Sequence, residues 1–172
     1  MKTIAIAGYS GSGKTTLIEK VIPCLVMEGV RVSLIKHAHH EFDIDQPGKD
    51  SYRHREAGAT EVLLTSSTRW ALMHELRNEE EPSLEEQLKR FSPCDLVIVE
   101  GWKYHAMPKI EVHRKLAGKP LLFPTDPTVV AIATDESLAT DKPQFSLDDG
   151  EGVAWFIINH LGLLKPAIKA VG

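Results

Sequence analysis

The chain has few cysteines, no long apolar run and no excess of positive charge. Its two cysteines, Cys24 and Cys94, form no C-x-x-C pair, so we expect reduced thiols in a cytoplasmic protein. No segment approaches the roughly 18 consecutive apolar residues of a membrane helix, so we expect the chain to stay in the cytoplasm. The short apolar run after Lys2 leads directly into a glycine-rich loop, so we expect no secretory signal.

Charge and length narrow the class of protein further. The 20 Lys+Arg and 24 Asp+Glu residues give a net charge of −4, which argues against nucleic acid or an acidic membrane as the main partner. Hydrophobic residues make up 42% of the chain and charged residues 26%, as is typical of globular proteins. We therefore expect a single domain over residues 1–172, in line with ordinary domain sizes.

A complete phosphate-loop motif lies near the start of the chain. Residues 8–15 read G-Y-S-G-S-G-K-T, match the pattern G-x-x-x-x-G-K-[ST] and follow the apolar residues 4–7. A glycine-rich turn between a strand and a helix points backbone N–H groups and the positive end of the helix dipole at one spot. The predicted polyphosphate ligands are Gly11, Ser12, Gly13, Lys14, Thr15 and Thr16. Among them, Lys14 would bind the outer phosphates and Thr15 magnesium, while Thr16 has helix capping as its alternative role.

Periodicity and turn residues predict the order of the elements. The predicted elements begin with strand, helix and strand, and such a unit must cross over to place its second strand parallel to the first. We expect an α/β fold of the P-loop NTPase class, with a mostly parallel central sheet flanked by helices and an additional hairpin or edge strands. The expected elements are a helix at 14–28 kinked or shortened by Pro23, a strand at 32–35, a helix at 51–57, a hairpin of 62–65 and 70–73, a helix from Ser83 through Phe91, a central strand at 96–99, an edge strand at 109–114, a loop at 115–128, a buried strand at 129–133 and a helix at 150–161 followed by a loose basic tail.

An acidic residue follows the most apolar strand. Glu100 comes directly after residues 96–99 and before Gly101. Phosphate-loop proteins place an acidic group at the end of a neighbouring strand, where it binds the magnesium shell or orients water. We assign Glu100 to catalysis and metal binding, with a charge merely leaving a buried strand as the alternative. Asp95 precedes the strand, at the wrong end for ligands, and is interpreted as a cap or turn residue.

A histidine-rich segment follows the second predicted strand. It contains His37, His39, His40, Asp43 and Asp45, near the sheet edge where α/β proteins bind ligands. One interpretation is a switch-like loop in which the aspartates contact magnesium-bound water and a histidine contacts phosphate or substrate. We assign Asp45 a catalytic role and Asp43 a metal-binding role on this basis. A zinc or nickel site and a hydrated polar loop are the alternatives.

The residue after the strand at 129–133 is a candidate for base recognition. Asp135 could accept hydrogen bonds from N1 and the exocyclic amino group of guanine, whereas adenine lacks this donor pair. The alternative is that Asp135 caps a helix beginning at Glu136.

Several further motifs occur in a recognisable order. They are K-H-A-H-H at 36–40 with the two aspartates, P-G-K-D-S at 47–51, A-G-A at 57–59, R-W-A-L-M at 69–73 and V-E-G-W-K at 99–103. Together with the phosphate loop, this set resembles the MobB family of molybdopterin-guanine dinucleotide biosynthesis adapter proteins over almost the whole chain. The resemblance implies a dimeric protein that binds GTP and Mg²⁺, hydrolyses GTP slowly and assists MobA, the guanylyltransferase that joins GMP to molybdopterin.

The resemblance carries specific residues with it. It implies phosphate and magnesium binding by the loop, Glu100 as the acidic partner, and a dimer through residues 69–75. Only the aspartate of the Asn-Lys-x-Asp motif is present, as Asp135. Two other functions stay open. A small-molecule kinase would need an arginine-bearing lid, which residues 115–128 do not provide, and a metal-insertion GTPase would depend on the three histidines.

Overall fold

The contacts of the chain divide it into two compact units. The computed structural model describes residues 1–38 and 42–163, so the predicted basic tail, His39 and His40 lie outside the described residues. The larger unit comprises Met1–His37 and Phe91–Gly172, and the smaller one Ala38–Arg90. The single folding unit expected from the sequence stays a prediction, because a division of contacts does not measure independent folding.

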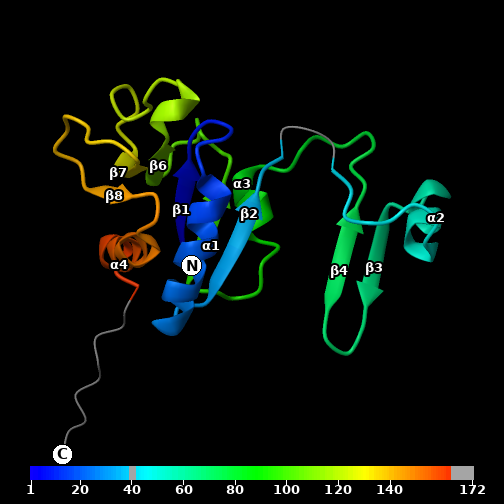
Figure 1. Ribbon diagram of the computed structural model, residues 1–172. Helices are drawn as coiled ribbons and strands as arrows, with labels where there is room; N and C mark the ends of the chain where they lie inside the picture. The colour runs from blue at the N-terminus through cyan, green and yellow to red at the C-terminus, as the bar shows by residue number, and fades with distance from the viewer. Residues whose placement is uncertain (39–41, 164–172) are drawn as a thin grey trace, which may run out of the picture. The chain divides into compact units, whose positions relative to one another are not determined.

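The larger unit is built on a six-stranded sheet with the order β2-β5-β1-β6-β7-β8. Figure 1 labels β2, β1, β6, β7 and β8 of this sheet. Every neighbouring pair is parallel, which confirms the predicted fold class. The strands are β1 (Lys2–Ala7), β2 (Val32–Lys36), β5 (Leu96–Glu100), β6 (Lys109–His113), β7 (Val129–Thr134) and β8 (Gln144–Ser146). Strand β8 was not predicted from the sequence, because its three residues are too few to show a period.

Two helices cover one face of this sheet. Alternate strand residues such as Ile4, Ile98 and Ile110 form one core with α1 (Lys14–Met27) and α4 (Gly150–Leu161), as the two-residue period of strands requires. Pro23 was predicted to kink or shorten the first helix. The shortening was wrong, because α1 continues through Pro23 to Met27, and the kink stays a prediction. A proline removes a single backbone donor, and α1 has a buried residue on each side of it, Val21 and Leu25.

Strand β6 corrects the sequence prediction most clearly. It was expected at an edge, but it lies between β1 and β7 with all five residues buried. Its charged residues have internal partners: Glu111 accepts hydrogen bonds from the backbone N–H groups of Leu122 (2.7 Å) and Phe123 (2.9 Å). Alternating charge usually indicates a solvated face. Here Glu111 fastens the segment after β6 to the second face of the sheet. This segment includes the short 3₁₀ helix η1 (Lys115–Ala117).

The smaller unit contains the predicted hairpin and two short helices. Its elements are α2 (Asp50–Glu56), β3 (Glu61–Thr65), β4 (Trp70–His74) and α3 (Leu84–Leu88). The strands pair antiparallel with Leu63 opposite Leu72, which confirms the hairpin. The predicted capping box at Ser83 is present. However, α3 ends before the predicted Phe91, because the chain tightens into a turn in which Arg90 N donates to Gln87 O. Within the described residues, no helix has the length and apolar character needed to cross a membrane.

Candidate functional site

The loop between β1 and α1 leads into a helix whose first backbone donors have no partner inside the helix. Gly13 is the N-cap of α1 in a left-handed conformation (φ 99°), and it provides no side-chain cap. The first N–H groups of a helix have no partner within the helix, and they carry the positive end of its dipole. The N–H groups of Lys14, Thr15 and Thr16 are therefore available to an anion.

The strand behind the loop requires glycine at its end. A Cβ placed on Gly8 would lie 2.3 Å from the backbone oxygen of Val112 and 2.8 Å from Ser12 Oγ. Only a residue without a side chain allows β6 to approach this closely. This packing fixes where the loop leaves the sheet.

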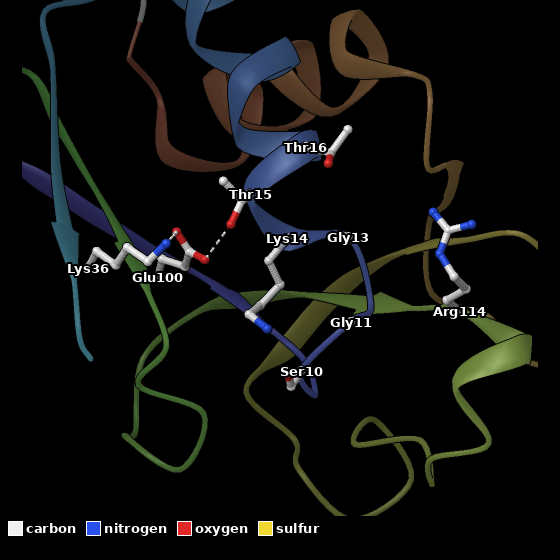
Figure 2. A pocket seen from close by; sticks show the side chains of 9 residues that line it. All are labelled: Ser10, Gly11, Gly13, Lys14, Thr15, Thr16, Lys36, Glu100 and Arg114. Carbon is white, nitrogen blue, oxygen red and sulfur yellow. Dashed lines mark hydrogen bonds and ion pairs between the residues drawn. The ribbon is translucent and has the colours of Figure 1, made fainter. Parts of the chain in front are cut away.

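The loop opens into a pocket of about 550 Å³ (Figure 2). Six of its residues were predicted from the sequence: Gly11, Gly13, Lys14, Thr15, Thr16 and Glu100. Three were not predicted as ligands: Ser10, Lys36 and Arg114. The loop motif identifies residues close in sequence, whereas Lys36 and Arg114 reach the pocket from the ends of β2 and β6. Their strand-end positions were the one available signal.

Two of the three predicted magnesium ligands, Thr15 and Glu100, lie in direct contact. The Thr15 hydroxyl donates to Glu100 Oε1 at 3.0 Å, and Lys36 Nζ lies 3.8 Å from Glu100 Oε2. Glu100 is 6% exposed, at the end of β5. Magnesium prefers hydroxyl, carboxylate and phosphate oxygens, so this donor set fits the ion. The structure brings these two predicted residues together, and their ligand roles stay predictions.

Positive charge dominates the pocket lining. Lys14, Lys36 and Arg114 are cationic, and Glu100 is the single carboxylate among the described residues that line the pocket. Lys14 Nζ donates to the Tyr9 carbonyl at 2.9 Å. Burial lowers the pKa of Lys14, Glu100 opposes this, and Lys103 and Lys36 lower the pKa further. Such a site favours a ligand with several negative charges, which would relieve the repulsion among the cations.

Ser12 was predicted as a phosphate ligand but does not line the pocket. It is 2% exposed, and its side chain packs against Gly8. Its Oγ has no hydrogen-bond partner within the described residues. The motif treats this position as variable, so the pattern gave no information about the side-chain direction. Any phosphate contact from Ser12 would come from its backbone.

Asp135 belongs to a second pocket at the ends of β7 and β8. This pocket of about 500 Å³ is lined by Thr134, Asp135, Glu136, Ser137, Gln144, Phe145 and Ser146. Asp135 Oδ1 accepts a hydrogen bond from Lys115 N at 2.8 Å, and Oδ2 lies 3.8 Å from Arg114 Nη1. The helix-capping alternative is wrong, because no helix begins at 136–138. The guanine contact stays a prediction.

Asp43 and Asp45 form ion pairs inside the smaller unit. Arg55 lies 2.7 Å from Asp43 Oδ2 and 3.4 Å from Asp45 Oδ2, and Asp45 also accepts a hydrogen bond from the Ser51 hydroxyl at 2.8 Å. The Asp45 N–H and Arg55 lower the pKa of Asp43. These contacts fasten the segment before α2 to that helix. The proposed catalytic and metal-binding roles of both aspartates stay predictions.

The histidine segment shows one described histidine. The His37 ring packs edge-on against Trp102 with centroids 5.3 Å apart. Over residues 1–38 and 42–163, no group of three His, Cys, Asp or Glu side chains is arranged to hold a metal. His39 and His40 lie outside that range, so the transition-metal hypothesis stays a prediction.

The chain is similar in sequence and in fold to proteins of molybdopterin-guanine dinucleotide biosynthesis. The family described as "Molybdopterin guanine dinucleotide synthesis protein B" (MobB) matches residues 3–135, which include the phosphate loop and Glu100. The molybdopterin-guanine dinucleotide biosynthesis adapter protein of Escherichia coli (strain K12) is 44% identical over 161 residues, covering 92% of each chain. The adapter protein of Haemophilus influenzae is also 44% identical, covering 92% of this chain and 88% of the relative. A crystal structure of molybdopterin-guanine biosynthesis protein B superposes with a TM-score of 0.75 at 30% identity, covering 93% of this chain and 99% of that one.

Proposed function

Because this chain belongs to the MobB family of molybdopterin-guanine dinucleotide biosynthesis proteins, we propose that it is a cytoplasmic adapter that binds GTP with Mg²⁺ and assists the guanylyltransferase MobA. The observation that carries the nucleotide proposal is the convergence of the first N–H groups of α1, Lys14 and the Thr15–Glu100 pair on one pocket. Backbone donors at a helix N-terminus are a standard phosphate site. The adapter role follows from the family.

The residues divide the proposed binding between phosphate and metal. The N–H groups of the loop and of early α1 hold phosphate oxygens, and Lys14 exchanges its contact with the Tyr9 carbonyl for the outer phosphates. Bound magnesium would neutralise part of the phosphate charge. Glu100 contacts the Thr15 hydroxyl and lies beside Lys36, and we assign it to the metal together with Thr15 rather than to the attacking water. Slow hydrolysis is the expected consequence.

Titration with GTP and with ATP, each with Mg²⁺, tests nucleotide binding and the guanine preference. We expect saturable binding of both, with tighter binding of GTP. Equal affinities would remove the guanine preference, and no binding of either would refute the proposal.

Glu100→Gln is expected to separate metal binding from phosphate binding. The amide keeps the size of the side chain but loses the negative charge that magnesium requires. GTP affinity measured without magnesium should stay within about twofold of wild type or increase, because a negative charge near the phosphates is removed. The gain in affinity on adding Mg²⁺ should be lost. If adding Mg²⁺ raises the GTP affinity of the variant as much as that of wild type, Glu100 is not a metal partner.

A homodimer is proposed through one face of the hairpin. Leu63, Leu72 and Trp70 alternate onto the same face of β3 and β4 and are 59%, 48% and 66% exposed. A lone two-stranded sheet is only marginally stable in water, and adjacent exposed apolar residues are typical of protein interfaces. A second copy of this chain is the occupant that the family resemblance implies. We call this surface the hairpin face.

Leu72→Glu should convert the dimer to a monomer, because it places a charge in the middle of the hairpin face. The matched control is Leu64→Glu, which changes a 45% exposed leucine of the same hairpin on the opposite face. Sedimentation should show a monomer for the first variant and a dimer for the second, with GTP affinity unchanged in both. Two variants of equal mass in solution would refute the hairpin face as the interface.

The adapter role is tested with MobA itself. Adding this protein with GTP and Mg²⁺ should increase the formation of the guanine dinucleotide by MobA. An unchanged yield would refute the adapter role. Transfer of phosphate to nucleosides or cofactor precursors would instead favour the small-molecule kinase.

A further inference from the structure

Arg114 lies on the opposite side of the phosphate loop from Glu100 and Lys36. Figure 2 shows Glu100 and Lys36 on one side of the loop and Arg114 on the other, beyond Gly13. A Cβ built on Gly13 would be 3.4 Å from Arg114 Nη2, so the guanidinium lies next to the turn that starts α1. Arg114 directly follows β6, a strand with neighbours on both sides, and therefore starts from a fixed backbone position.

A short chain of contacts orients this arginine. Asp135 Oδ2 lies 3.8 Å from Arg114 Nη1, and Asp135 is itself anchored where its Oδ1 accepts the Lys115 N–H at 2.8 Å. The side chains are 42% and 31% exposed, so the pair is accessible to a ligand. Arg114 lines the first pocket and Asp135 the second. Their ion pair thus joins the two pockets.

We propose that Arg114 binds the α- or β-phosphate of the nucleotide and that Asp135 is its positioning residue. The inference rests on the proposed nucleotide binding. In a phosphate loop the backbone N–H groups surround the α- and β-phosphates, while the lysine reaches the β- and γ-phosphates. A guanidinium beside Gly13 is therefore next to the inner phosphates. Its planar set of donors matches two phosphate oxygens at once.

The contacts of Asp135 favour positioning over base recognition. A carboxylate that reads guanine must offer one oxygen to N1–H and the other to the exocyclic amino group. In this chain Oδ1 already accepts the Lys115 N–H, and Oδ2 faces Arg114. If the Asp135 side chain turned toward a base, it would lose the hydrogen bond from Lys115 N–H and the ion pair with Arg114. If it positions Arg114, it keeps both contacts.

The first test compares Arg114→Gln with Lys115→Gln in the full chain. Lys115 is the matched control because it also loses one positive charge, yet it is 73% exposed, pairs with Glu136 and does not line the phosphate pocket. Calorimetric titration with GDP, GTP and ATP, each with Mg²⁺, should show affinity reduced on the order of tenfold for all three in Arg114→Gln. Arg114→Lys should restore part of it, and Lys115→Gln should behave as wild type.

Equal affinities in the two glutamine variants would overturn the proposal for Arg114. A loss confined to GTP and ATP, with GDP unaffected, would also overturn it, because the contact would then be to the γ-phosphate. If wild type binds no nucleotide, the proposed function fails together with this inference. Binding by wild type with no effect of Arg114→Gln refutes this inference alone.

The second test separates the two roles of Asp135. Asp135→Asn keeps an oxygen for the Lys115 N–H but removes the ion pair to Arg114. We expect GTP and ATP affinities to change by one common factor, within about fivefold because the pair is partly exposed. The change should vanish when Arg114→Gln is also present. A shift in the ratio of GTP to ATP affinity would restore base recognition and overturn the positioning role. The absence of any effect of Asp135→Asn in the chain that retains Arg114 would also overturn it.

Discussion

Replacing Lys14 with alanine is expected to weaken Mg²⁺–GTP binding by about 10- to 150-fold. This corresponds to about 1.5–3 kcal/mol, the usual value of a hydrogen bond to a charged group. Lys14 lines the pocket, and the Tyr9 carbonyl that it contacts at 2.9 Å is a neutral acceptor, so a phosphate oxygen would be the stronger partner. Isothermal titration of the variant and wild type measures the difference directly.

Lys20→Ala is the matched control for that experiment. Lys20 lies on the same helix and pairs with Asp148, and it does not line the phosphate pocket. Its loss should leave GTP affinity within about twofold of wild type, since screening weakens exposed charges at a distance. Equal losses in both variants would mean that Lys14 acts only through the net charge of the protein, and the loop would lose its assigned role.

Replacing Lys109 with methionine should destabilise the protein by about 3–5 kcal/mol, the usual cost of removing one partner of a buried ion pair. Lys109 is 1% exposed, and its Nζ lies 2.7 Å from Asp126 Oδ2. The same amine donates to the carbonyls of Lys103 and His105 at 2.8 and 2.9 Å. Methionine fills a similar volume but leaves these three acceptors without a donor. Urea unfolding of the full chain measures the effect.

Two controls identify the ion pair as the cause. The double variant Lys109→Met with Asp126→Asn should lose less stability than the sum of the two single variants' losses.

The second control is the pH dependence of the loss. Partial burial raises the pKa of Asp126, but Lys109 and Thr128 together lower it below its ordinary value. A carboxyl with a lowered pKa stabilises the fold above its ordinary pKa and loses that contribution as the pH falls. The difference between wild type and Lys109→Met should therefore shrink between about pH 7 and about pH 3. A difference independent of pH would assign the loss to packing.

The sequence predicted the local features of the site well. The phosphate loop, α1 and the strand ending at Glu100 were all located, because an apolar run, a glycine pattern and a helical period lie within one short stretch each. The contact between Thr15 and Glu100 follows from the rule that parallel strands present their carboxyl ends at one edge. Here β1 and β5 are direct neighbours, as that argument requires.

The missed features depend on long-range pairing. Lys109 and Glu111 gave β6 the pattern of an edge strand, and nothing local showed that Asp126 and the backbone of Leu122 would satisfy them. The same limit hid Arg114, which reaches the phosphate loop only because β6 lies beside β1. A residue brought to a site by strand order cannot be recognised before the order is known.

The most direct measurement is a calorimetric titration of the wild-type chain with GTP, GDP and GMP in the presence of Mg²⁺. If the phosphate groups occupy the loop at the start of α1, affinity should increase with each added phosphate, with one nucleotide bound per chain. Three equal affinities, or no binding at all, would contradict the account, because a site formed by helix N–H groups and lysine must distinguish one phosphate from three.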